Sequence, residues 1–151
     1  MPKHFEKRKL AYSSEFLYAI VEDVQKYPQF LPWVKGCIIS NKHAERFDAK
    51  LTVGYNSLAQ TSYTSRVHLV PTRKIEIEYL SGPFKHLNNS WTFKEIDTRE
   101  TEIEFLIDFS LKSQLLQSFI ENFFSQALKN MLQAFEKRAA ELHALKLMEK
   151  S

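Results

Sequence analysis

The sequence predicts an α+β fold in which a curved antiparallel sheet of about six to seven strands wraps around one long C-terminal helix. Two observations lead to this class. The last quarter of the chain contains no Pro or Gly, and its apolar residues recur three and four positions apart, which is the spacing of one helix face. Residues 37–109 instead alternate apolar and polar side chains between short turns, as strands with one buried face do.

The C-terminal helix is expected from Ser113 to Leu142, with a continuation toward Leu147. Ser113 is a favoured N-cap residue, and the segment is rich in good helix formers. Its apolar face is too wide for one neighbouring helix to cover, so we interpret it as core packed against the sheet. The residues of that face are Leu116, Ile120, Phe123, Phe124, Ala127, Met131, Ala134, Phe135 and Leu142.

Composition favours a single folded domain over residues 1–151, with a core at about 4–142 and residues 143–151 frayed. The chain is 44% hydrophobic and 13% aromatic, and it holds no apolar run long enough to span a membrane and no signal peptide. Cys37 is the one cysteine, so an internal disulfide is excluded. The net charge of +3 comes from scattered Lys and Arg, which does not favour a nucleic-acid-binding stripe, and we expect no DNA partner.

The N-terminal part predicts a strand at His4–Leu10 and a short helix capped by Ser13 and Ser14. That helix should end near Tyr27, because the residue before Pro28 avoids the helical conformation. The next segment, Tyr27-Pro-Gln-Phe-Leu-Pro-Trp33, gathers four large apolar side chains around two prolines. Such a segment either plugs the core or lines the mouth of a cavity, and the sequence leaves both interpretations open.

The strands that follow are joined by short turns and predict a meander. We expect a strand from Cys37, turns near residues 59–60, 71–73 and 97–100, and a long turn from Ser81 to Asn89. Small residues on the inner face would leave room beside the helix, and these are Ala49, Ser57 and Ser65. Lys50 and Arg66 fall on the outer face, where we expect solvated charges rather than ligand contacts.

Three motifs carry a family resemblance that extends over nearly the whole chain. They are Tyr27-Pro-x-Phe-Leu-Pro-Trp33, Thr64-Ser-Arg-Val67 and Gly82-Pro-Phe-Lys85 followed by Leu87 and Trp91-x-Phe93. Together they resemble the START-like, helix-grip family of ubiquinone-binding proteins, the polyketide cyclase/dehydrase and lipid-transport group that also includes the bacterial ribosome association toxin. Val34 stands where many relatives have Cys, and Ser81 where several have Asp.

The resemblance implies a bacterial cytoplasmic protein, peripheral at the inner membrane face, that binds ubiquinone or a similar polyprenyl lipid and supports respiratory electron transport. It implies no covalent cofactor, no metal and a transient contact with the membrane surface. We expect Phe84 to stack on a quinone ring and Lys85 to donate to its carbonyl, with a core role for Phe84 as the alternative. The candidate cavity residues are Tyr27, Phe30, Leu31, Trp33, Tyr55, Tyr63, Phe84, Lys85, Trp91, Phe123, Ala127 and Met131.

Two other functions remain open beside quinone binding. The first is association with the large ribosomal subunit, which would need Lys and Arg gathered on one face. The second is a polyketide-cyclase reaction, which would need an acid or base in the cavity, with Tyr55 or Tyr63 as nominees. No metal-ligand spacing, glycine-rich phosphate loop or Gly-x-Ser-x-Gly elbow is present, so we expect a protein that is not an enzyme.

Overall fold

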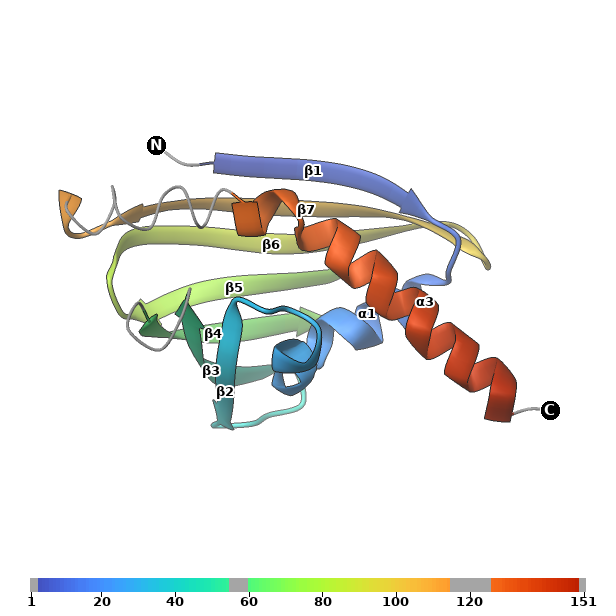
Figure 1. The fold of residues 1–151 in the computed structure, drawn as a ribbon, viewed down its shortest axis with the longest axis horizontal. Coiled ribbons are helices and arrows are strands. Elements are labelled where there is room, and N and C mark those ends of the chain that lie inside the picture. Colours follow the sequence, from blue (N-terminus) through green and yellow to red (C-terminus); the bar gives the residue numbers. More distant parts are fainter. Residues whose placement is uncertain (1–2, 55–59, 115–125, 150–151) are drawn as a thin grey trace.

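The expected α+β class is confirmed in a computed structural model that describes residues 3–54, 60–114 and 126–149. Seven strands form one antiparallel sheet in the order β1-β7-β6-β5-β4-β3-β2 (Figure 1). The elements in chain order are β1 (Lys3–Leu10), α1 (Ser14–Glu22), the 3₁₀ helix η1 (Val24–Gln29), β2 (Val34–Ser40), β3 (Arg46–Gly54), β4 (Gln60–Val70), β5 (Lys74–Ser81), β6 (Phe84–Asp97), β7 (Glu100–Leu111) and α3 (Met131–Glu149).

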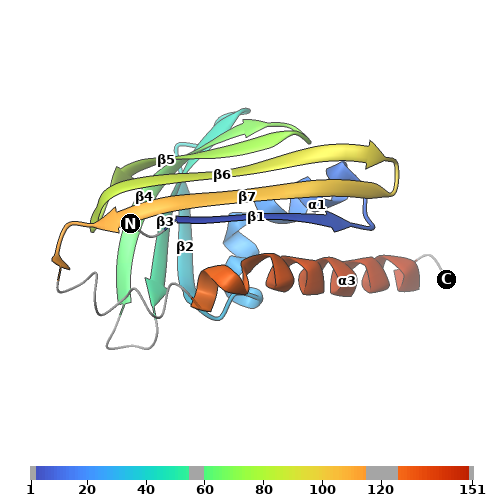
Figure 2. The ribbon, with the colours of Figure 1, turned by 90° about the horizontal axis from the view of Figure 1, so that it is seen from above.

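The helices lie on one face of the curved sheet. Figure 2 shows α3 running along the β1 and β7 side, with α1 beside it on the same face. The consecutive strands β2 to β7 form the predicted meander, and β1 adds at the far edge by pairing antiparallel with β7. This arrangement leaves a concave sheet surface between β3 and β7 for the helices to cover.

Strand periodicity explains which side chains face the helices. In β7, Ile103, Phe105 and Phe109 are fully buried, while Glu104 between them lies on the outer face. There Glu104 Oε1 lies 3.5 Å from Lys7 Nζ and 3.3 Å from a lysine of β6. Around Glu104 the outer face is therefore polar, and its charges are paired across strands.

The expected single helix from Ser113 is interrupted at Asn130. The N–H of Asn130 is shared between the carbonyls of Gln126 and Ala127, at 3.2 Å each, and α3 starts at the next residue. Asn is a poor helix former because its side chain competes for nearby backbone groups, so the break falls where propensity is weak. Residues 115–125, which include Phe123, lie outside the described part of the chain.

At its other end α3 includes the expected continuation past Leu142 toward Leu147 and runs two residues beyond it. It is helical to Glu149, where we expected frayed residues, because no Gly or Pro ends it earlier. Figures 1 and 2 show its last turns projecting past the sheet. Leu145, Leu147 and Met148 are exposed on this projection. Among the described residues, no helix is both long and apolar enough to cross a bilayer.

Two further boundaries differ from the sequence expectation. The long turn predicted at Ser81–Asn89 is only the pair Gly82-Pro83, and β6 begins at Phe84. Gly82 has φ 142°, a conformation that lets the chain reverse within two residues. The first helix also ends earlier than expected, at Glu22, and η1 carries the chain past Tyr27. The predicted N-cap of α1 is confirmed, since the Phe16 N–H donates to Ser13 Oγ at 3.2 Å.

Candidate functional site

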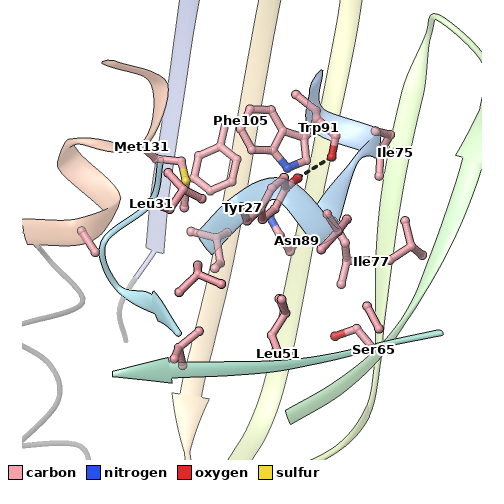
Figure 3. A pocket seen from close by; sticks show the side chains of 18 of the residues that line it. Tyr27, Leu31, Leu51, Ser65, Ile75, Ile77, Asn89, Trp91, Phe105 and Met131 are labelled. Carbon is pink, nitrogen blue, oxygen red and sulfur yellow. Dashed lines mark hydrogen bonds between the residues drawn. The ribbon is translucent and has the colours of Figure 1, made fainter. Parts of the chain in front are cut away.

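A cavity of about 90 Å³ lies between the concave sheet and the helical elements. Figure 3 shows its walls, with η1 and α3 on one side and the strands on the other. Apolar side chains make up most of its surface. The lining residues are Val21, Val24, Tyr27, Leu31, Trp33, Val34, Ala49, Leu51, Val53, Tyr63, Ser65, Val67, Ile75, Ile77, Asn89, Trp91, Phe105, Ile107, Ala127, Leu128 and Met131.

Small side chains on the sheet contribute to the space. Ala49 of β3 and Ser65 of β4 are direct partners in the strand register, and both are buried. Neither fills the gap between the pleated sheet and the opposite wall. The expectation that these two positions leave room on the inner face is confirmed, whereas Ser57 lies outside the described residues.

The opposite wall is built by the aromatic segment after α1. Tyr27 packs edge-on against Phe135 of α3, with ring centroids 5.4 Å apart, and its hydroxyl donates to the Val21 carbonyl (Figure 3). Burial raises the pKa of the Tyr27 phenol far above its usual value, so the group stays neutral. Leu31 is held below it by a 2.8 Å backbone bond from its own N–H to the Tyr27 carbonyl.

Few polar groups interrupt the apolar lining. Ser65 Oγ is buried without a hydrogen-bond partner in the described structure. Asn89 of β6 anchors its amide by donating from Nδ2 to the Leu106 carbonyl at 2.8 Å. Burial raises the pKa of Tyr63 to about 12, so this phenol is neutral as well.

Seven of the predicted cavity residues come together in this lining, and three of them belong to the aromatic segment Tyr27–Trp33. The seven are Tyr27, Leu31, Trp33, Tyr63, Trp91, Ala127 and Met131. Phe30 does not line the cavity: its ring lies 5.0 Å from that of Phe135 and beneath the Arg138 guanidinium at 5.2 Å. Phe30 therefore fastens the segment to α3. Tyr55 and Phe123 lie outside the described residues.

The Gly-Pro-Phe-Lys turn lies away from the cavity lining. Phe84 is buried among Tyr63, Tyr79 and Phe109, with ring centroids 5.2 to 5.7 Å apart. Its N–H donates to the Tyr79 hydroxyl at 3.0 Å. Phe84 thus has the core role that we had kept as the alternative to ring stacking, and Lys85 is exposed.

Asn89 is the polar lining residue that the sequence reasoning missed. The predicted turn ended at Asn89, so this residue was not placed on a strand. Once β6 begins at Phe84, Asn89 shares the inner face with Leu87, Trp91 and Phe93. A lone amide in an alternating apolar run was the signal that could have identified it. No cluster of three metal-binding side chains occurs in the ranges that the structure describes.

Comparison with known proteins decides the family. Residues 10–136 match the family described as polyketide cyclase / dehydrase and lipid transport. This chain belongs to that family. The expected START-like architecture is confirmed by solved structures. A START superfamily protein from Mycobacterium smegmatis has a TM-score of 0.76 at 19% identity and covers 93% of this chain and 98% of its own.

Two kinds of characterised protein are similar in sequence to this chain, a ribosome association toxin and a coenzyme Q-binding protein. The ribosome association toxin RatA of Escherichia coli is 33% identical over 95% of this chain and 90% of its own length. The mitochondrial coenzyme Q-binding protein COQ10 of Drosophila melanogaster is 33% identical over 86% of this chain and 55% of its own. The fold is also shared with the Zhui aromatase/cyclase of Streptomyces sp. R1128, with a TM-score of 0.80, 17% identity and coverage of 92% and 93% of the two chains.

Proposed function

We propose that this protein binds a neutral polyprenyl quinone, such as ubiquinone, or a closely related lipid, and carries it without chemical change. The observation that carries the proposal is the cavity, which is enclosed by apolar side chains and holds a few neutral polar groups. Sites for small apolar ligands have this composition. The similarity to a coenzyme Q-binding protein supports the same ligand class.

The electrostatics of the lining favour a neutral ligand over an anionic lipid. No Asp, Glu, Lys, Arg or His is among the described residues that line the cavity. The phenols of Tyr27 and Tyr63 are held neutral by burial, which raises the pKa of each. A carboxylate or phosphate would lose its hydration here without gaining a counter-charge, which is strongly unfavourable. Quinone carbonyls need only neutral donors.

The same composition supports binding rather than cyclase chemistry. Acid/base catalysis needs a group that titrates near neutral pH within reach of the substrate. Among the described lining residues, the titratable side chains are the phenols of Tyr27 and Tyr63, and burial raises the pKa of both away from neutrality. This described part of the lining therefore offers hydrogen bonds and apolar contact, but no acid or base suited to proton transfer.

Binding of a substituted ring requires the cavity to widen. Its volume of about 90 Å³ is smaller than the cavity of about 150 Å³ that accepts benzene in an engineered protein core. Met131 is suited to yield, because its unbranched side chain adapts to irregular space. It is the first residue of α3, directly after the break at Asn130. We expect the ring to displace this side chain.

Titration with a short-chain ubiquinone tests the proposal. Ala49→Leu extends a buried side chain into the cavity, whereas Ala140→Leu makes the same change at an exposed position of α3. We expect micromolar binding by the wild type, a loss of at least tenfold in Ala49→Leu and no change in Ala140→Leu. Ala127→Leu, from the opposite wall, repeats the test if Ala49→Leu unfolds. Equal affinity in all variants, or no binding by the wild type, would contradict the proposal.

Ribosome association is the second candidate function, because RatA matches this chain over 95% of its length. The outer face of the sheet is not an obvious RNA surface, since several of its cations are neutralised by carboxylates. Arg66 Nε lies 2.9 Å from Asp48 Oδ1, and Lys74 Nζ lies 2.8 Å from Glu76 Oε1. Co-sedimentation with purified large ribosomal subunits at physiological salt tests this candidate. Failure to co-sediment removes it.

A further inference from the structure

Ser65 carries a buried hydroxyl without a partner in the described structure, on the wall of a largely apolar cavity. The residue is 2% exposed, and its Oγ makes no hydrogen bond within the described structure. Most buried polar groups in folded proteins are hydrogen-bonded, so each exception needs a reason. Figure 3 shows this side chain on the cavity side of its strand. A ligand oxygen in the cavity would supply the missing partner.

We propose that the Ser65 hydroxyl donates a hydrogen bond to one ring carbonyl of the bound lipid, and that Asn89 binds an oxygen on the opposite side of the ring. This inference rests on the proposed quinone-binding function and assigns an orientation to the ligand. The ring enters the cavity first and lies across β4, β5 and β6.

The strand register supports two separate polar contacts. Asn89 pairs with Ile77, which pairs with Val67, and Ser65 lies two residues from Val67 on the same face of β4. With strands about 4.8 Å apart and about 3.3 Å per residue, the Ser65 and Asn89 backbones are roughly 12 Å apart. One ligand oxygen cannot reach both groups. A ring with oxygens on opposite sides can, and a para-quinone has this arrangement.

The hydrogen bond from Asn89 to the Leu106 carbonyl fixes the orientation of the Asn89 side chain toward a ligand. One of its two amide hydrogens is committed to the Leu106 carbonyl, which fixes the plane of the amide. The side chain retains a second N–H and an acceptor oxygen. Ser65 can likewise donate or accept. The site can therefore hold the quinone and its reduced hydroquinone form, whose oxygens exchange acceptor and donor roles.

Tyr18 provides a matched control inside the same protein. Its hydroxyl is also buried without a partner in the described structure, but Tyr18 packs on Phe93 and is not among the lining residues. Removing either hydroxyl deletes one unsatisfied buried polar atom. Only the Ser65 hydroxyl should matter for the ligand. Ser65→Ala should leave the free protein equally stable or more stable, because replacing an unpaired buried hydroxyl removes a desolvation cost.

The test compares wild type, Ser65→Ala and Tyr18→Phe with a short-chain ubiquinone and with an analogue of equal tail whose ring lacks the two carbonyls. We expect Ser65→Ala to bind the quinone about tenfold more weakly, to bind the analogue like the wild type, and to shift the infrared carbonyl stretch of the bound quinone. Tyr18→Phe should match the wild type in each respect.

Two outcomes would overturn the inference while the proposed function stands. One is quinone affinity in Ser65→Ala within twofold of the wild type. The other is a clear loss of stability in unliganded Ser65→Ala, because the hydroxyl would then already have a partner such as a buried water. If wild type binds neither compound, the proposed function itself fails. The inference is retained only if the loss is specific to the carbonyl-bearing ring.

Discussion

Position 82 requires glycine, because of both its backbone conformation and its close neighbours. Its φ of 142° is rarely adopted by other residues, and a Cβ built there would lie 2.6 Å from Tyr63 Cβ. Gly36 has nothing within 4 Å of the same position and no such φ. We predict that Gly82→Ala lowers the free energy of unfolding by about 2–4 kcal/mol, from backbone strain and overpacking. Gly36→Ala should change it by less than about 1 kcal/mol.

Urea denaturation at constant m-value measures both glycine variants. The comparison separates a position that needs glycine, the turn at Gly82, from one that tolerates a side chain, Gly36 in β2. A Gly82→Ala protein as stable as the wild type would show that the Gly82-Pro83 turn and its contact with Tyr63 are described incorrectly.

The lowered pKa of Asp48 predicts how the free energy of unfolding depends on pH. Hydrogen bonds from Arg66 and Asn41 lower the pKa of this carboxyl to about 2, whereas an unfolded Asp titrates near 4. Because the folded value is the lower one, the carboxylate contributes stability above pH ~4, and that contribution is lost as pH falls from about 4 toward 2. The stability difference between wild type and Asp48→Asn should shrink over this range. A difference that is constant with pH would contradict the assignment.

Single residues were predictable where periodicity alone decides their face. Ala49 and Ser65 were placed on the inner face, and Arg66 on the outer face, by strand alternation. Asn89 was missed because its strand was predicted to begin after it. The partner of Arg66 could not be predicted either, because Asp48 lies on another strand and its position depends on register.

At the scale of elements, α3 combines a buried part with a projecting part. Phe135 is buried against Tyr27, Phe30 and Trp91, whereas Leu145 is exposed near the free end of the helix. We predict that Phe135→Ala costs about 3–5 kcal/mol, the usual range for deletion of a buried aromatic ring. Leu145→Ala should cost less than about 0.5 kcal/mol. Equal losses in thermal or urea denaturation would mean that the end of the helix is also packed.

Element types were predictable from the sequence, while several of their boundaries were not, and two of these show why. Strand alternation and helical spacing are local properties, so they identify the meander and the C-terminal helix directly. The break at Asn130 depends on two competing backbone acceptors. The early start of β6 depends on the tight turn at Gly82, where the chain reverses within two residues. Both boundaries are determined by local backbone geometry. The residue types Asn and Gly allow that geometry but do not by themselves predict it.

At the scale of the whole molecule, the central claim is that the space between sheet and helices is a ligand site. Its lining draws on α1, η1, six strands of the sheet (β2 to β7), α3 and the residues just before α3. The cavity therefore exists only in the assembled fold. Its presence was expected from the family resemblance and the small inner-face residues, but its polar contacts required the strand register. Membership of the family alone does not distinguish quinone binding from ribosome association.

Isoleucine-methyl NMR during titration with a short-chain ubiquinone tests this claim most directly. Ile75, Ile77 and Ile107 line the cavity, whereas Ile38 and Ile96 are exposed, at 66% and 47% of their surface. The account predicts saturable shifts in the methyl signals of the first three and unchanged signals from the other two. Shifts confined to Ile38 and Ile96, or no saturable shift in any of the five, would contradict it.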